Sequence, residues 1–323
     1  MSAIPATATP ATQPPAGFRH KALMYEGERG FLEGTLPFLR EGIALGQPAL
    51  VVVAPRKIAR LREALGEDAR HVHFDDMRHV GVNPARIIPA WNDFFERAGA
   101  GGRPLRGIGE PIWAERSAAE LVECHRHESL LNLAFADAAD FRLLCPYDTT
   151  ALAPAVVAEA RRTHPLVSED GSVHESTCFH GMEAAGLPCT APLPPAPAAA
   201  DELPIDARSL AMVRAAVTRH AVRAELAPGR IEDVVLAVNE LATNSIVHGG
   251  GRGTLHVWMD ADALVCEVSD DGTLELPLAG RHRPAEGEIG HYGLWLVNHL
   301  CDFVEQRTPP GGGNVVRVTM RGE

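Results

Sequence analysis

Short apolar runs alternate with amphipathic stretches over roughly the first half of this chain. Uninterrupted apolar runs, such as residues 49–54, are typical of strands buried on both faces, and the stretches between them repeat apolar residues at helical spacing. The pattern predicts strands at 20–26, 49–54, 71–74, 105–108 and 141–144, and helices at 31–45, 57–65, 84–98, 117–135 and 154–162. Such alternation predicts an α/β domain of three layers, in which helices cover both faces of a mainly parallel sheet.

The C-terminal region has a different pattern. It predicts helices at 207–224, 230–248 and 292–301, and strands at 254–259, 264–269, 303–307 and 315–321. Helices over a mixed, antiparallel-rich sheet predict an α/β sandwich. Between the two regions, residues 168–188 show no clear period, and the Pro/Ala-rich stretch 191–200 is typical of a semi-rigid linker.

These patterns divide the chain into a tail (1–17), a first domain (18–167), an irregular segment with a linker (168–204) and a second domain (205–323). A length of 323 residues is enough for two domains with cores of their own. The tail is rich in Pro, Ala and Thr and lacks the basic start and apolar core of a secretory signal. We therefore expect it to be disordered.

Composition narrows the range of partners. A formal net charge of −12 argues against direct nucleic-acid binding, which needs a basic surface. The apolar runs are far too short to cross a membrane, so we expect no membrane association. The six cysteines, at 124, 145, 178, 189, 266 and 301, form no disulfide framework, and we expect a reduced, cytoplasmic environment.

The clearest chemical signal lies in the second domain. Glu240 and Asn244 are four residues apart on a predicted helix, so they share one face, with His248 a further turn along. A carboxylate, Asp270, follows a predicted strand. Glycines that would let backbone approach a ligand come after it, at Gly272, Gly290 and Gly293.

In this order and spacing, these residues resemble the ATP-binding domain shared by histidine kinases, gyrase-type ATPases and anti-sigma-factor serine kinases. The resemblance covers about residues 206–321 and implies a Bergerat-type α/β sandwich. The family's Glu-x-x-x-Asn box matches Glu240 and Asn244, and its Gly-x-x-Gly-Leu-x-Leu-Val box matches 290–297 in full. Its Asp-x-Gly-x-Gly box matches Asp270 and Gly272, whereas Leu274 stands in place of the second glycine.

The resemblance implies ATP and Mg²⁺ as cofactors and gives each residue a role. Glu240 would be the general base, and Asn244 would complete the Mg²⁺ shell. Asp270 would accept the adenine amino group. The backbone of Gly272, Gly290, Gly293 and Leu294 would approach the nucleotide.

For two features of this site, the sequence is compatible with two different roles. His248 would contact phosphate or cap the C-terminus of its helix. Residues 273–289 would form a lid, whose Arg281, His282 and Arg283 would reach phosphate or remain exposed solubilising charge.

The rest of the chain favours one branch of the family. A histidine kinase needs an acceptor histidine, and the sequence around His220 lacks that pattern; gyrase-like proteins need further transducer domains. The remaining relative, the anti-sigma serine kinase, binds a sigma factor and phosphorylates a serine on an anti-anti-sigma (STAS-type) antagonist. Those kinases commonly dimerise, which favours a homodimer. The alternative is a non-catalytic ATP-binding protein that sequesters a partner.

The first domain resembles the sensory domain of dichloromethane-repressor-like and methanogen regulators over about residues 18–165. The resemblance rests on the segments 20–25, 36–42, 109–110, 128–132 and 145–148. The turn at 26–30 lacks the Gly-Lys-Ser/Thr of a phosphate-binding loop, so no second ATPase is predicted. We expect this domain to sense a small molecule or a protein.

Two groups that contain cysteine and histidine residues are candidate metal ligands. One places Cys124, His127 and Glu128 on one helix face, and the other is formed by His174, Cys178, His180 and Cys189. Neither group has the spacing of a closed structural zinc site, so no metal is predicted at either.

Overall fold

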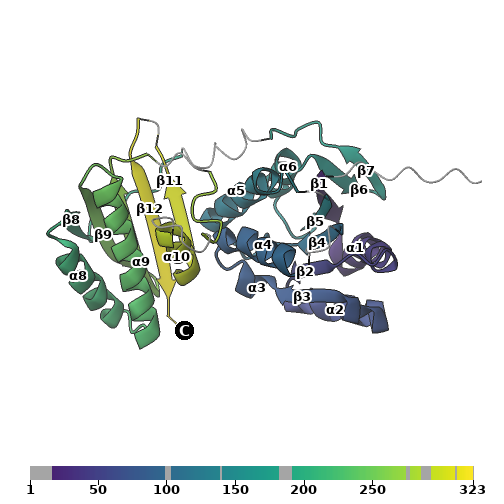
Figure 1. The fold of residues 1–323 in the computed structure, drawn as a ribbon, viewed down its shortest axis with the longest axis horizontal. Coiled ribbons are helices and arrows are strands. Elements are labelled where there is room, and N and C mark those ends of the chain that lie inside the picture. Colours follow the sequence, from purple (N-terminus) through teal and green to yellow (C-terminus); the bar gives the residue numbers. More distant parts are fainter. Residues whose placement is uncertain are drawn as a thin grey trace, which may run out of the picture.

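A computed structural model describes residues 17–98, 103–138, 140–181, 191–273, 277–284, 292–309 and 311–322. Each half of the chain forms a sheet with its own helices, and the two units lie side by side (Figure 1). The chain is therefore an α/β protein with two separate sheets, as the sequence predicts. Of the predicted disordered tail, residues 1–16 fall outside the described part.

The N-terminal sheet has seven strands in the order β3-β2-β4-β5-β1-β6-β7. Its strands are β1 (Gly17–Tyr25), β2 (Ala49–Val53), β3 (Val72–Asp76), β4 (Leu105–Gly109), β5 (Asp140–Asp148), β6 (Leu166–Glu169) and β7 (Ser172–Glu175). All neighbouring pairs are parallel except β6 and β7. This agrees with the predicted mainly parallel sheet.

Helices cover both faces of this sheet. They are α1 (Gly27–Ala44), α2 (Pro55–Leu65), α3 (Met77–Val80), α4 (Ile87–Ala98), α5 (Ala118–Ala134) and α6 (Pro154–Thr163), with short 3-10 turns η1 (Gly66–His71) and η2 (Pro84–Arg86). Alternate residues of β2 enter different cores: Val51 packs with α1 and α2, whereas Val52 packs with α3 to α6. The three predicted layers are therefore present.

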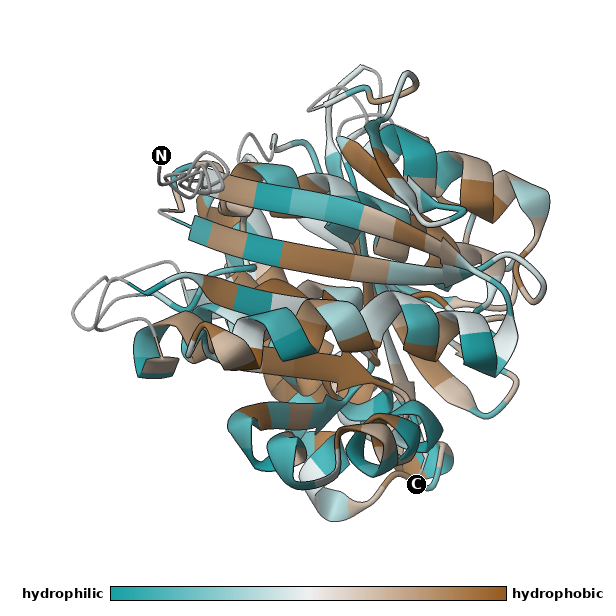
Figure 2. Cartoon of the chain, turned by 90° about the vertical axis from the view of Figure 1, so that its right-hand side faces the viewer, coloured by the Kyte–Doolittle hydropathy of each residue, from teal (hydrophilic) through white to brown (hydrophobic). Residues whose placement is uncertain are grey.

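Hydrophobic colouring runs along strands inside the molecule, and hydrophilic colouring lies on outer turns of the helices (Figure 2).

The start of α5 is fixed by a capping box, in which the Ser117 hydroxyl accepts from the Glu120 amide and the Glu120 carboxylate accepts from the Ser117 amide. Side chains of this helix reach the other half of the chain.

The C-terminal sheet has five antiparallel strands in the order β11-β12-β10-β9-β8. The strands are β8 (Asp201–Ile205), β9 (Gly253–Asp260), β10 (Ala263–Asp270), β11 (Phe303–Arg307) and β12 (Asn314–Arg321), and the helices are α8 (Leu210–Arg223), α9 (Pro228–Val247) and α10 (Tyr292–Leu300). One apolar core fills the space between the sheet and these helices. This is the predicted sandwich of helices on an antiparallel-rich sheet.

The expectation of an irregular segment and linker over 168–204 is partly wrong. Strands β6 and β7 form a hairpin across its start, and β8 occupies its end. All four residues of β7 are exposed, and β8 is an edge strand that contains Pro204. Neither strand carries the apolar alternation that sequence patterns detect.

No helix within the described residues is long and apolar enough to cross a membrane.

Candidate functional site

Helix α9 brings the predicted carboxylate and amide to the start of α10. An atom added as a Cβ on Gly293 would lie 3.2 Å from Glu240 Oε2 and 3.3 Å from Asn244 Nδ2. The glycine therefore allows the backbone of α10 to pass close to both side chains. Glu240 and Asn244 are half-buried, so they are ordered by packing yet within reach of solvent.

Asp270 stands at the end of β10 and is held by two hydrogen bonds. The Ser245 hydroxyl donates to Oδ2 over 2.6 Å, and the Gly272 amide donates to Oδ1 over 2.9 Å. An ionised carboxylate has about four acceptor positions, so two remain for a ligand. Gly249 closes the other side, where a Cβ would lie 2.5 Å from Asp270 Cγ.

A cavity of about 740 Å³ opens beside these residues. Its volume falls within the range of small-molecule sites, roughly 300–1,000 Å³. Apolar side chains line much of it, namely Leu133, Leu241, Val268, Leu278, Leu294 and Val316. Among the described lining residues, Asp270 supplies the carboxylate, while His248, His282 and Arg283 supply basic groups.

The predicted site residues gather at this cavity with two exceptions. Its lining includes Asn244, His248, Asp270, Gly272, Gly293 and Leu294. Glu240 does not line the cavity, although it lies beside Asn244 at Gly293. Gly290 lies outside the described residues. His248 is both exposed at the C-terminal cap of α9 and part of the lining, so both of its alternatives are compatible with the geometry.

Two family models match the chain. The MEthanogen/methylotroph, DcmR Sensory (MEDS) domain matches residues 19–165, and the histidine kinase-like ATPase domain matches residues 203–320. The chain joins a MEDS domain to a histidine kinase-like ATPase domain. The curated proteins include no match.

One solved structure similar to this chain contains the RsbU and RsbW domains of Rv1364c from Mycobacterium tuberculosis. The two are 19% identical, with a TM-score of 0.29. The similarity covers 39% of this chain and 33% of that chain, so this chain spans about a third of its neighbour's length.

Of the predicted lid, the structure describes residue 273 and the segment 277–284, and this lid segment lies between the ATPase domain and the MEDS domain. Leu278 packs against the MEDS core, and His282 Nδ1 lies 3.0 Å from Asn92 Nδ2 of α4. His282 and Arg283 line the cavity, whereas Arg281 is buried with its guanidinium 3.6 Å from Glu123 of α5. Burial lowers the pKa of His282, so among the described residues of this segment Arg283 is the permanently charged group that lines the cavity.

Glu123 is the centre of a buried charge cluster between the domains. Its carboxylate forms ion pairs with Arg307 of β11 and Arg281 of the lid segment, and with Arg126 of its own helix at 3.5 Å. All four side chains are nearly inaccessible to solvent. A buried carboxylate is stable only with such partners, so this cluster fixes α5 against the ATPase domain.

Helix α10 is also fixed from the MEDS domain. Arg86 of η2 donates to the carbonyls of Asn298 and Cys301 over 2.9 and 2.8 Å, and Asn83 donates to the Asn298 carbonyl over 2.9 Å. These carbonyls belong to the C-terminal end of α10, where a guanidinium satisfies unpaired acceptors and suits the helix dipole. No sequence pattern predicts this contact, because the partners are more than 200 residues apart.

Proposed function

We propose that this chain is an ATP- and Mg²⁺-dependent anti-sigma regulator. Its ATPase domain would bind a sigma factor and phosphorylate a serine on an anti-anti-sigma antagonist, under the control of the MEDS domain. The observation that carries the proposal is the convergence of Asn244, Asp270 and Gly293 on one cavity of nucleotide size. The sigma factor and its antagonist enter through the family resemblance of the three sequence boxes.

The phosphate end of the nucleotide would lie near Asn244. Its amide oxygen is the kind of neutral ligand that Mg²⁺ takes alongside phosphate oxygens and water. Glu240, one helical turn earlier, would accept the proton of the attacking serine hydroxyl. Arg283 and the amide groups at the start of α10 would balance the phosphate charge.

The adenine end would lie between apolar side chains of α9 and the sheet. Leu241, Val268 and Val316 line the cavity beside Asp270. The remaining acceptor positions of the Asp270 carboxylate would take the exocyclic amino group of adenine. Guanine carries a carbonyl oxygen at that position. This oxygen would face the Asp270 carboxylate, and because both groups are hydrogen-bond acceptors, guanine would bind less well than adenine.

Control by the MEDS domain is supported by where the domains meet. The MEDS domain contacts the lid segment through Glu123 and Asn92, and the C-terminal end of α10 through Arg86. Both elements border the nucleotide cavity. A signal that shifts α5 or η2 would therefore act directly on the elements that enclose ATP.

A second candidate is a non-catalytic protein that binds ATP and sequesters a partner. The observation that favours it is the position of Glu240, which is absent from the cavity lining. In this case ATP would order the lid segment and no phosphoryl transfer would follow.

The first test is calorimetric titration of the full-length protein with ATP and Mg²⁺, with GTP as the competing nucleotide. We expect saturable, Mg²⁺-dependent binding of ATP over GTP and at least about tenfold weaker binding by Asn244→Ala, a loss of about 1.4 kcal/mol. Asn239→Ala is the matched control, because Asn239 lies on the same helix and contacts Arg214 away from the cavity. Absence of ATP binding would rule out both candidate functions.

One substitution then distinguishes the two candidate functions, the kinase and the non-catalytic sequestering protein. Glu240→Gln should retain ATP binding and lose phosphate transfer from labelled ATP to STAS-type proteins of the same organism, by a factor of about 100 or more. Glu232→Gln, an exposed change on the same helix, should transfer normally. Equal transfer by both variants would show that Glu240 is not the base, and no transfer by the unmodified protein would favour the sequestering candidate.

A further inference from the structure

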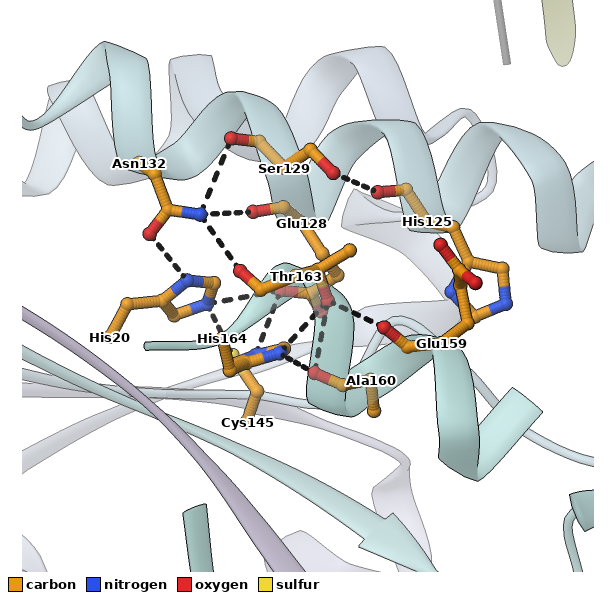
Figure 3. Close-up of polar contacts among 10 residues, drawn as sticks. All are labelled: His20, His125, Glu128, Ser129, Asn132, Cys145, Glu159, Ala160, Thr163 and His164. Atoms are coloured by element: carbon orange, nitrogen blue, oxygen red, sulfur yellow. Dashed lines mark hydrogen bonds and ion pairs between the residues drawn. The ribbon is translucent and has the colours of Figure 1, made fainter. Parts of the chain in front are cut away.

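Four ligand-type side chains meet inside the MEDS domain, far from one another in sequence. His20 lies on β1, Glu128 on α5, Cys145 on β5 and His164 just after α6 (Figure 3). One donor atom from each lies within 4.8 Å of the other three, and all four residues are buried. Neither Cys124 nor His127, which helix spacing grouped with Glu128, belongs to this set of four, and the Cys124 thiol instead donates to the Pro111 carbonyl.

The imidazole rings are oriented with one nitrogen of each toward the cluster. His164 Nδ1 lies 2.8 Å from the Ala160 carbonyl and 3.0 Å from the Thr163 hydroxyl; because the carbonyl can only accept, the shorter contact favours a proton on Nδ1. His20 Nδ1 lies 3.1 Å from Asn132 Oδ1, and the Asn132 amide is held in that orientation because its Nδ2 donates to the Thr163 carbonyl over 2.8 Å. In the neutral rings, both Nε2 atoms are therefore bare acceptors.

These two acceptors face a third, the Glu128 carboxylate. Glu128 Oε2 lies 3.1 Å from His20 Nε2 and 3.4 Å from His164 Nε2, while Cys145 Sγ lies 3.4 Å from His20 Nε2. Glu128 Oε1 and His164 Nε2 are buried and have no hydrogen-bond partner among the described residues. Lone pairs directed at one another in a dry interior are unfavourable unless a proton or a metal cation lies between them.

We propose that His20, Glu128, Cys145 and His164 form a binding site for a divalent transition metal ion, with Zn²⁺ as the favoured ion. Two imidazoles, a thiolate and a carboxylate form a donor set that suits Zn²⁺. Zinc–ligand bonds of about 2.1 Å place neighbouring donors roughly 3.4 Å apart in a tetrahedron, close to the three distances given above. The carbonyl of Ala160 and the amide of Asn132 are the outer partners that metal-bound histidines use to fix their rings.

Four protein ligands make this a closed site that stabilises the domain rather than a site with an open position for substrate. Binding would release the Cys145 thiol proton to solvent and form the metal–sulfur bond, with no change in oxidation state. The metal would tie β1, β5 and the end of α6 to α5, the helix that carries Glu123 at the domain contact.

The test uses the full chain, stripped with a chelator and titrated with Co²⁺ and with Zn²⁺. We expect one equivalent per chain, the sulfur-to-cobalt charge-transfer absorption of thiolate ligation, and loss of that absorption in Cys145→Ser with at least about tenfold weaker Zn²⁺ binding. Cys124→Ser is the matched control, since Cys124 is equally buried but outside the cluster. It should bind as the unmodified protein does.

A measurement on the unmodified protein covers the case in which Cys145→Ser fails to fold. Zn²⁺ should raise the thermal midpoint of the stripped protein by several degrees, because a ligand that binds only the folded state stabilises it. No binding at micromolar Zn²⁺ and no shift in midpoint would overturn the proposal. So would a cobalt spectrum that survives in Cys145→Ser and disappears in Cys178→Ser, which would assign the metal to the exposed Cys178.

Discussion

Gly249 determines how closely α9 and β10 can approach at the nucleotide cavity. Its Cα leaves no room for a side chain, because a Cβ would lie 2.5 Å from Asp270 Cγ and 2.7 Å from the Ser245 carbonyl oxygen. Both neighbours are fixed: Ser245 is in the helix, and the Asp270 carboxylate is held by two hydrogen bonds. Such contacts require displacement of backbone or of a bonded carboxylate.

Gly249→Ala should therefore lower the free energy of unfolding by about 2 kcal/mol, as expected for overpacking at a rigid contact, and should weaken ATP binding through Asp270. Urea unfolding and nucleotide titration would measure the two effects. Gly229→Ala is the control, since an added Cβ there meets no atom within 4 Å and the position lies in the first turn of α9. It should be neutral or slightly stabilising. An equal loss in both variants would contradict the close-contact explanation.

Among individual residues, the sequence predicted those whose relation to one another depends on short sequence spacing. Glu240 and Asn244 are one helical turn apart, and Asp270 precedes a glycine at a strand end; both relations are visible in the sequence. Ser245 as the partner of Asp270, and Glu128 as the partner of His20 and His164, depend on contacts 25 to 108 residues apart. No periodic pattern encodes such distances, so these partners could not be predicted.

Among the elements, α5 connects more of the molecule than any single motif suggests. Glu123 faces the ATPase domain, Glu128 faces the His and Cys cluster, and Leu133 lines the nucleotide cavity. Successive steps of five residues rotate by about 140° around a helix, so these side chains occupy three different faces. A helix buried on all sides has polar groups wherever it meets a polar partner, and its apolar stripe is correspondingly weak.

Glu123→Gln should destabilise the folded protein by about 3 kcal/mol, since it removes the carboxylate that balances a group of buried guanidinium groups. Denaturant unfolding would measure the loss. Glu33→Gln breaks the exposed pair between Glu33 and Arg29 and should cost less than about 1 kcal/mol. A similarly small loss for Glu123→Gln would mean that the domain contact does not depend on this charge cluster.

Strong periodicity explains which elements the sequence predicted. The buried strand β2 and the amphipathic helices α2 and α4 have clear patterns, and each is present in the structure. The short helix α3 and the edge strands β7 and β8 were not predicted. They are held by neighbouring elements rather than by a pattern of their own.

For the whole molecule, the contact of η2 with α10 predicts energetic coupling between the two domains. Arg86→Ala removes the guanidinium that binds the Asn298 and Cys301 carbonyls, so the C-terminal end of α10 keeps only the Asn83 hydrogen bond among those described above. We expect the affinity for Mg²⁺-ATP to change by about 5-fold or more, the scale of typical coupling between sites. Calorimetric titration would measure it.

Arg40→Ala is the matched control for this experiment. Arg40 also donates to a backbone carbonyl, that of Ala64, but within the MEDS domain and on its exposed surface. Its loss should leave nucleotide affinity unchanged. Identical affinities for both variants and the unmodified protein would contradict coupling through η2.

The position of Leu133 links the cavity to the arrangement of the two domains. This residue belongs to the MEDS domain, yet together with side chains of the ATPase domain it lines the cavity that would enclose ATP. A nucleotide in the cavity would thus contact both domains and hold them together. The domains could not swing apart without opening the pocket, so the compactness of the protein in solution would itself report whether ATP is bound.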